Sequence, residues 1–478
     1  MRTRLILGAL ATLLLAACGD DDTSEPTDAG LDAAIDLGPP PEWPGELAET
    51  DTLGDRRGRA IARSIVHIHS PLSHDACDGE GWVDGELADP TCLEHFRAAA
   101  CALNMDVLFL TDHVPHVHEV PFEEGLWIGE PFGAAPVMNE TGDTVASRLT
   151  CPSGHQVLLT LGSENELMPL ALDRHPTEST DLMDLEDVYE GSTPEVIAGL
   201  RDAGGLVWAA HTEEKDLDWL RRVQPDGLEL YNLHANVDPT IRSESLGLEP
   251  APYLGRLLDF TRAGLRLAPD LAVMTFLDPN RVALERWDTL LAEGTHVVGT
   301  GGCDAHENAF PQLLTDGERA DSYRRMMSWI TNHLLVDERT PEAYEAALAE
   351  GRVFAVFEFL GTPTGLDFVA TSGAESYDMG ETAPLGATIH APLPVIGDTH
   401  PVDPETTISL HLIHSQDGGG VEVASATDAD LEFTPTEPGA YRLEVRMVPE
   451  HTRPYLNRRA DELIRELPWA YSNPIFVE

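Results

Sequence analysis

The chain has 478 residues, of which 42% are hydrophobic, so it is long enough for one large domain and a smaller one around real apolar cores. Its 83 Asp and Glu residues far outnumber its 30 Lys and Arg residues, giving a formal net charge of -53. A surface of this sign repels nucleic acid and anionic lipid at long range, so we expect a small-molecule substrate and no nucleic-acid partner. Solubility or adaptation to salt would also account for the acidity.

The N-terminus predicts export and a lipid anchor. A basic start is followed by an apolar run over residues 5–17, which is shorter than the roughly 20 residues of a membrane span. The ending Leu15-Ala16-Ala17-Cys18 resembles a bacterial lipobox, and this resemblance implies removal of residues 1–17 and lipidation of Cys18. An ordinary signal peptide with an accidental cysteine is the alternative. We therefore expect an extracytoplasmic protein that contacts a bacterial membrane, at the periplasm or cell surface, only through this lipid.

Residues 18–60 are assigned to an acidic tether. The stretch is rich in Asp, Glu, Ala, Thr and Pro and has little apolar surface to bury, which is typical of a disordered linker. Export permits disulfides among the remaining cysteines. Cys303 is the expected free thiol, and the pairing of the other four is not readable from the sequence; they are Cys77, Cys92, Cys101 and Cys151.

Strands and helices alternate over residues 61–361, in the order typical of a parallel sheet. The expected strands cover residues 65–69, 106–110, 157–161, 206–210, 228–231, 296–299 and 353–359. The expected helices cover residues 93–103, 194–203 with Thr193 as the cap, 252–267, 281–293, 323–335 and 341–350. About seven such units favour an α/β barrel that is closed or nearly closed.

The sequence pattern changes over residues 362–478. Turns rich in Gly, Pro and Thr separate short alternating strands at 366–371, 388–390, 407–413, 441–447 and 475–477, with one helix at 457–466. This pattern predicts a C-terminal β-sandwich of about seven strands.

Metal-ligand residue types follow the predicted strands of the barrel. His67 and His69 are two residues apart on a strand, so both imidazoles share one face. The other strand ends carry His113, Glu164, His211, Asp304 and His306. In a parallel barrel these ends converge on one rim, which predicts a cluster of divalent metal ions there. Imidazole plus carboxylate ligands suit Zn, Mn or Fe.

These residues resemble the PHP family, named after polymerase and histidinol phosphatase. The resemblance rests on His67-x-His69, Thr111-Asp112-His113, Gly162-x-Glu164, Ala210-His211 and Asp304-x-His306 in that order. Further motifs at 351–354 and 468–475 resemble the CehA/McbA-like metallohydrolase branch. The resemblance implies a distorted (β/α)7 barrel over residues 61–361 joined to a C-terminal β-domain.

The resemblance also implies a ligand set for two or three ions. The first ion would take His67, His69, Glu164 and Asp304; the second would share Glu164 and add His175 and His211; the third would take Asp75, His113 and His306. His74 is the alternative to Asp75. The expected catalytic residues are Glu164, Asp304 and His211.

Other polar residues near these motifs have two readings each. Asp112 is expected to orient its neighbouring ligand rather than bind metal. Arg174 and Lys215 could hold a substrate anion or be ordinary surface charges. Four more could line the pocket or lie on a solvated face: Glu166, His116, His118 and His234.

The predicted chemistry is metal-dependent hydrolysis. Two close divalent ions lower the pKa of a bridging water, so that a hydroxide nucleophile exists at neutral pH. Hydrolysis of small phosphate esters is the first hypothesis. A carboxylester, carbamate or amide hydrolase with the same site is the second, and a non-catalytic surface lipoprotein that binds metal or glycans is the third. The oligomeric state is not readable from the sequence.

Overall fold

The computed structural model describes residues 42–114, 116–179, 181–249 and 252–478. The predicted signal peptide, the lipidation site Cys18 and the first part of the tether lie outside these residues. No helix among the described residues is both long and apolar enough to span a bilayer.

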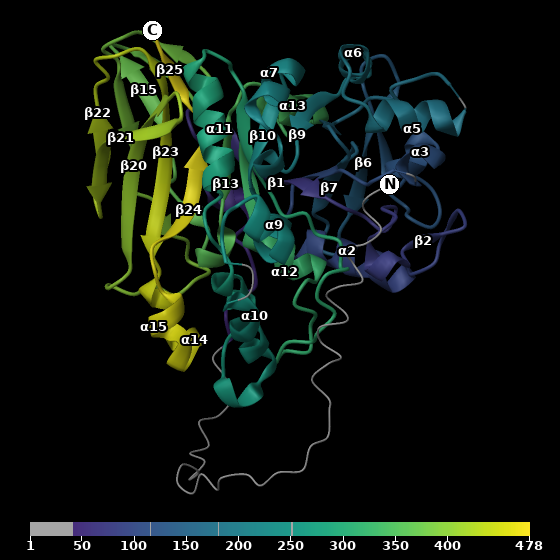
Figure 1. Cartoon of the computed structure of the whole chain (residues 1–478), viewed down its shortest axis with the longest axis horizontal. Coiled ribbons are helices and arrows are strands. Elements are labelled where there is room, and N and C mark those ends of the chain that lie inside the picture. The colour runs from purple at the N-terminus through teal and green to yellow at the C-terminus, as the bar shows by residue number, and fades with distance from the viewer. Residues whose placement is uncertain (1–41, 115, 180, 250–251) are drawn as a thin grey trace, which may run out of the picture. The chain divides into compact units, whose positions relative to one another are not determined.

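The described chain is a mixed α/β structure, as predicted, and its largest sheet has thirteen strands (Figure 1). At its centre, strands β1 (Ala60–Ile68), β4 (Val107–Leu110) and β7 (Gln156–Leu161) run parallel. Every residue of β1 from Ile61 onward is buried, because the strand has neighbours on both sides. Strands β12 (Thr331–Val336) and β13 (Val353–Val356) extend the sheet from β1 in antiparallel fashion.

A second sheet has four strands in the order β11-β10-β9-β8. Strand β10 (Gly227–Asn232) is parallel to β9 (Leu206–Ala209) and to β11 (Val298–Gly302), and β8 (Met168–Leu170) is antiparallel to β9. Single bridges, Ile68 to Ala305 and Leu161 to Leu172, connect this sheet region to the ends of β1 and β7. The closed (β/α)7 barrel stays a prediction, since no continuous ladder of strand pairs joins the two sheets among the described residues.

The strands near the C-terminus continue the large sheet. Strand β24 (Leu467–Ser472) pairs with β13, and β23 (Gly439–Val448) pairs with β24. Beyond them lie β25 (Ile475–Val477), β17 (Thr382–Ala383), and the hairpin of β20 (Thr407–Gln416) and β21 (Gly419–Thr427). A separate antiparallel sheet contains β15 (Val369–Ser372), β16 (Glu375–Tyr377), β18 (Thr388–Ala391) and β22 (Leu431–Phe433). The structure therefore does not confirm a sandwich that stands apart, because Pro40–Glu478 is one compact unit.

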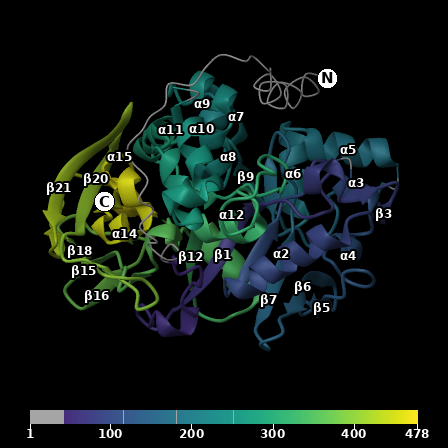
Figure 2. The same ribbon diagram turned by 90° about the horizontal axis from the view of Figure 1, so that it is seen from below.

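Helices cover the strands, and side-chain caps define where several of them begin. Helix α6 (Pro194–Asp202) starts at the predicted cap, with the Thr193 hydroxyl accepting a hydrogen bond from the Val196 amide. Helix α2 (Pro90–Ala102) packs against α12 (Tyr323–Trp329) (Figure 2). Helix α11 (Arg281–Ala292) packs between β10 and the hairpin of β20 and β21 (Figure 1).

Three predicted helices are shorter than expected. The helix predicted at 457–466 is reduced to a 3-10 turn (Asn457–Arg459) and α15 (Ala460–Leu463). The helix predicted at 323–335 ends at Trp329, and residues 331–336 form β12 instead. These residues pair with both β1 and β13, so tertiary pairing overrides the local preference. The helix predicted at 252–267 ends at Leu257 and continues as short 3-10 turns.

Part of the segment assigned to the tether is folded. Trp43 is only 5% exposed, and its ring packs edge-on against Tyr455 at a centroid distance of 4.9 Å and against His400 at 5.2 Å. Leu47 and Leu53 are buried as well. This short segment therefore belongs to the folded core.

The cysteines pair within the first part of the chain. Cys77 is bonded to Cys92 and Cys101 to Cys151, while Cys303 is free and buried, as predicted. The first disulfide ties the loop after β1 to the start of α2. Disulfides of this kind fit the oxidising compartment expected after export.

A buried ion pair joins α11 to the C-terminal strands. Arg442 on β23 donates two hydrogen bonds to the Asp288 carboxylate on α11, at 2.8 and 2.7 Å, and both side chains are at most 3% exposed. Replacing Arg442 by Met would leave the Asp288 charge buried and unpaired. We expect this variant to lower the free energy of unfolding by about 3–5 kcal/mol in urea titrations.

The exposed pair of Arg221 and Glu293 is the matched control, and Arg221→Met should change stability little. Adding Asp288→Leu to Arg442→Met should restore part of the loss, because the Asp288 carboxylate is then no longer buried without its partner, while Glu444 keeps its contact with Arg446. Equal effects of Arg442→Met and Arg221→Met would contradict the assignment.

Candidate metal centre

The ends of strands from both sheets bring the predicted ligands together. His67 lies on β1 and His69 just beyond it, His113 follows β4, Glu164 follows β7, and His211 follows β9. Asp304 and His306 follow β11. The predicted ligands gather here with the exception of His175. All of them except His211 form two groups that share His69. His211 lies beside these groups, with Nε2 3.2 Å from Oε1 of Glu164 and 3.5 Å from Oδ2 of Asp304.

The first group contains His67, His69, Glu164 and Asp304, and all four residues are buried. The Nε2 atoms of the two imidazoles are 3.1 Å apart. Each Nε2 lies 3.3 Å from Oδ1 of Asp304 and 3.3–3.4 Å from Oε2 of Glu164. Four potential ligand atoms therefore surround one small space.

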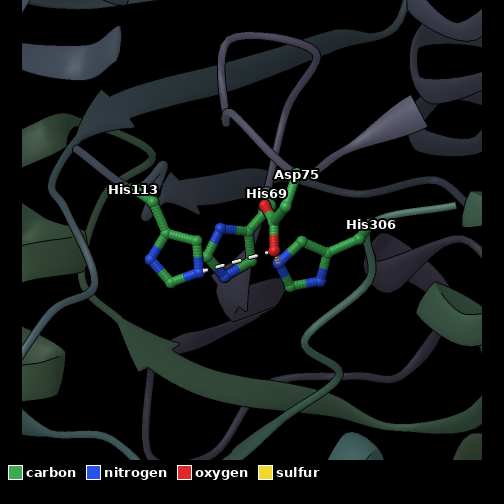
Figure 3. A group of neighbouring side chains, drawn as sticks. All are labelled: His69, Asp75, His113 and His306. Carbon is green, nitrogen blue, oxygen red and sulfur yellow. Dashed lines mark ion pairs between the residues drawn. The ribbon is translucent and has the colours of Figure 1, made fainter. Parts of the chain in front are cut away.

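The second group contains His69, Asp75, His113 and His306, whose side chains converge in Figure 3. Oδ2 of Asp75 is 3.9 Å from Nε2 of His113 and 3.5 Å from Nε2 of His306. The rings of His69 and His306 stack with centroids 3.8 Å apart. The group includes a carboxylate oxygen of Asp75 and no atom of His74, which was the alternative.

Glu164 lies between the two groups. Its Oε2 is 3.4 Å from Nε2 of both His69 and His113, and its Oε1 is 3.2 Å from Nε2 of His211. The carboxylate is thus placed where it could bridge two cations.

Five imidazoles of the centre point the same ring nitrogen, Nε2, toward the cluster. A protein oxygen near Nδ1 holds each ring in this orientation. Nε2 faces the cluster, while Nδ1 lies within hydrogen-bond distance of a neighbouring oxygen. For His67, His113 and His306 these oxygens are Glu229 Oε1 at 2.8 Å, the Glu164 carbonyl at 2.6 Å and the Asp304 carbonyl at 3.0 Å. For His69 and His211 they are Ser73 Oγ at 3.3 Å and Glu213 Oε1 at 3.2 Å. Metal-binding histidines are typically held in this way.

Glu229 is a functional residue that the sequence analysis missed. It lies buried in the middle of β10, where Oε1 accepts from His67 Nδ1. Oε2 accepts from the His211 amide at 2.9 Å and from Asn232 Nδ2 at 3.0 Å. A Cβ at Gly302 would collide with this carboxylate, so the glycine makes room for it. The available signal was a lone acidic residue inside an apolar strand.

Two ligands have strained backbones. His211 has φ 46° and Asp304 has φ 50°, in the left-handed region that side chains other than glycine seldom adopt. Such conformations cost on the order of 1–3 kcal/mol each and persist where the surrounding structure enforces them. In these conformations His211 Nε2 lies 3.2 Å from Oε1 of Glu164, and Asp304 Oδ1 lies 3.3 Å from Nε2 of His67.

The electrostatics of the centre favour a cation. Burial alone would lower the pKa of His67, but Asp304, Glu229 and Glu164 raise it well above its usual value. Hydrogen bonds to Asp304 and Glu164 likewise outweigh burial and raise the pKa of His69 to about 9. The same imidazoles hold the pKa of Glu164 and of Asp304 well below the usual range, against the opposing effect of burial.

The residues present fit a divalent metal ion. Oδ1 of Asp304 and Nε2 of His306 are buried yet have no hydrogen-bond partner, and both face the cluster. The donors are imidazole nitrogens and carboxylate oxygens, a set that suits Zn, Mn or Fe. The nearby Cys303 thiol donates to the His67 carbonyl instead. Because a bound cation must displace protons from these imidazoles, its affinity should fall as the pH falls.

His175 is not brought to the cluster. Its Nδ1 lies 2.8 Å from the Tyr189 hydroxyl and its Nε2 lies 3.0 Å from the Val120 carbonyl, so both ring nitrogens have protein partners. The sequence-based assignment of His175 to the second ion is therefore not supported. His234 lies at the cluster instead, with Nδ1 3.3 Å from Oδ2 of Asp304 and a side chain that is 41% exposed.

The remaining candidates lie around the centre. Asp112 accepts hydrogen bonds from the amide and hydroxyl of Ser70, so it fixes the loop after β1 rather than a ligand ring. Glu166 accepts from Trp219 Nε1, and Lys215 lies over the same indole ring. The rings of His74 and His116 lie near the centre, with His74 5.4 Å from His113 between centroids.

Comparisons with known proteins add little. No family model and no curated protein matches the chain. Among solved structures it is similar to a two-domain protein from Bacteroides vulgatus that contains a predicted PHP-like metal-dependent phosphoesterase. The identity is 12%, the TM-score is 0.33, and the match covers 90% of this chain and 98% of that chain. A similarity this weak decides neither the fold nor the chemistry.

The contrast between His113 and His175 gives a direct test of the ligand set. His113→Ala removes a ligand atom from the second group, whereas His175→Ala removes a side chain whose nitrogens bind protein. Elemental analysis of the purified variants should show at least one ion fewer per chain for His113→Ala and an unchanged number for His175→Ala. A lower ion content in His175→Ala would restore it to the ligand set.

Glu229→Gln tests whether Glu229 holds His67 and His211 in position. An amide cannot accept from the His67 ring, the His211 amide and Asn232 all at once, because one of its two ends is a donor. We expect the affinity for a divalent metal ion to fall about 10- to 100-fold in competition titrations. Glu166→Gln is the matched control and should bind metal like the parent, whereas equal affinities of all three proteins would contradict the role given to Glu229.

Proposed function

We propose that this protein is a metal-dependent hydrolase of small esters, with phosphate esters as the first substrate class, built on a PHP-type distorted (β/α)7 barrel. The observation behind the proposal is the pair of ligand groups that share His69 and meet at Glu164. The order of the ligand motifs along the chain also resembles the PHP family.

The two groups suggest where ions would be held. His67, Glu164 and Asp304 would hold one ion, and Asp75, His113 and His306 a second, with His69 available to either. Divalent ions in these positions would activate a water nucleophile and polarise the attacked group. Two ions match the arrangement of these side chains better than three, because His175 is absent from the cluster.

The protein itself would orient both ions and substrate. Glu229 and Glu213 keep Nε2 of His67 and His211 directed inward. His234 approaches Asp304 through Nδ1, which leaves its Nε2 for substrate or water. Burial of the first group excludes most solvent from the reacting region.

A carboxylester, carbamate or amide is the second candidate substrate class, and one observation favours it. Among the described residues, the carboxylates of the cluster pair only with histidines, and its histidines pair only with carboxylates. No Lys or Arg side chain forms an ion pair with a residue of the cluster. The charge of a phosphate group would thus be balanced by the ions alone. A neutral carbonyl ester makes no such demand.

A three-substrate assay separates these functions. Metal-reconstituted protein should hydrolyse p-nitrophenyl phosphate or its bis-ester, and Glu164→Gln should lose essentially all of this activity because it disturbs both ligand groups. Turnover of p-nitrophenyl acetate alone would replace the phosphoesterase by the second candidate. Full metal occupancy without turnover of any ester would instead favour a binding lipoprotein.

The anchor and the location belong to the same proposal. Export, lipidation at Cys18 and attachment to a bacterial membrane follow from the N-terminal sequence alone. The two disulfides are compatible with that location.

A further inference from the structure

An apolar pocket opens directly beside the metal-ligand cluster. Asp304, His306 and His234 form one side of it. The other side is hydrocarbon and is made mainly by Leu233, Val237, Leu257, Phe276, Met326 and Trp329. These residues come from the segment between β10 and α11 and from α12, so the wall is assembled from distant parts of the chain.

The other polar groups in the pocket wall already have partners. Asn308 donates to the Asp75 carbonyl at 2.9 Å, and the Glu307 carboxylate lies 3.0 Å from Nδ1 of His95. The Asp321 carboxylate accepts from the Ala309 and Phe310 amides, each at 2.7 Å, and from Arg319 Nε at 2.8 Å. Trp329 donates to the Asp270 carbonyl through its indole nitrogen. A second anionic group placed in this pocket would lose water and face the Glu307 and Asp321 carboxylates without gaining a cationic partner.

No lysine or arginine is among the described residues that line the pocket. A sugar, a nucleotide or a substrate with a second phosphate would need donors or cations there. A hydrocarbon group needs neither, and it gains from leaving water.

We propose that this pocket binds the apolar alkyl or aryl group of the substrate ester, while the reacting centre of the ester lies at the metal-ligand cluster. The inference rests on the proposed hydrolase function and narrows its substrates to monoesters of apolar alcohols. The position of Asp304 and His306 on one side of the pocket fixes how the ester would lie. Its reacting centre would be at these two residues, and its hydrocarbon group would extend away from them.

The gain per carbon sets the expected size of the effect. Burial of one methylene group strengthens binding roughly fourfold. The enclosed volume of the pocket is about 30 Å³, so affinity should rise by about this factor for the first added carbons and then level off once the pocket is full.

Alkylphosphonates test the pocket independently of turnover, because their carbon–phosphorus bond is not an ester bond. Calorimetry on the metal-reconstituted full chain should show affinity rising from methylphosphonate to hexylphosphonate. In parallel, kcat/KM should rise from methyl phosphate to hexyl phosphate and stay low for glycerol phosphate. Affinity that does not change with chain length would overturn the inference.

Two methionines provide a matched pair of variants. Met326 is half-buried in the pocket wall, whereas Met138 on β5 (Ala135–Met138) is 60% exposed and lies outside it. Met326→Gln should reduce the gain from methyl- to hexylphosphonate several-fold while leaving methylphosphonate affinity nearly unchanged. Met138→Gln should leave the whole series as in the parent, and equal responses of the two variants would count against the pocket.

The two proposals can fail separately. Hydrolysis of methyl phosphate with no dependence on chain length removes the pocket and keeps the hydrolase. A chain-length dependence of phosphonate affinity without hydrolysis of any ester keeps the pocket and removes the hydrolase. Absence of binding by every phosphonate would overturn both.

Discussion

Two buried carboxylates, those of Glu164 and Asp304, lie within 3.5 Å of imidazole nitrogens from several strands, and this gathering constrains the rest of the structure. Such groups can be buried together only when protons or cations lie between them. The raised pKa of His67 and the lowered pKa of Glu164 both express this requirement. A divalent ion meets it with more charge than a proton and satisfies the unpartnered Oδ1 of Asp304.

The fold places these groups by ending parallel strands from two sheets at one point. The bridge from Ile68 to Ala305 joins β1 to the segment after β11, and it fixes His67 and His69 opposite Asp304. Glu229 on β10 links β1 to the end of β9, because its carboxylate contacts both the His67 ring and the His211 backbone. The left-handed φ of His211 and Asp304 is thus part of an arrangement with little freedom to relax.

The C-terminal strands brace this arrangement from the opposite edge. Strands β12 and β13 lie between β1 and β24, so hydrogen bonding continues from the ligand strand into the last residues of the chain. The buried contacts of Arg442 with Asp288 add a second connection, between β23 and a helix of the first part. Because the two parts share one sheet, we expect them to unfold together rather than as independent domains.

The sequence alone determined which residue types follow which strands, and so it named the candidate ligands His67, His69, His113, Glu164, His211, Asp304 and His306. These residues are adjacent to apolar strands in the chain, and convergence of parallel strand ends does the rest. It also identified Cys303 as the free thiol and Thr193 as a helix cap, since both depend on local context. Only the tertiary structure decided that His175 binds Tyr189 and Val120, that Glu229 supports the ligands, and that residues 331–336 form a strand. Each of these depends on contacts between segments far apart in sequence, and local patterns contain no information about such partners.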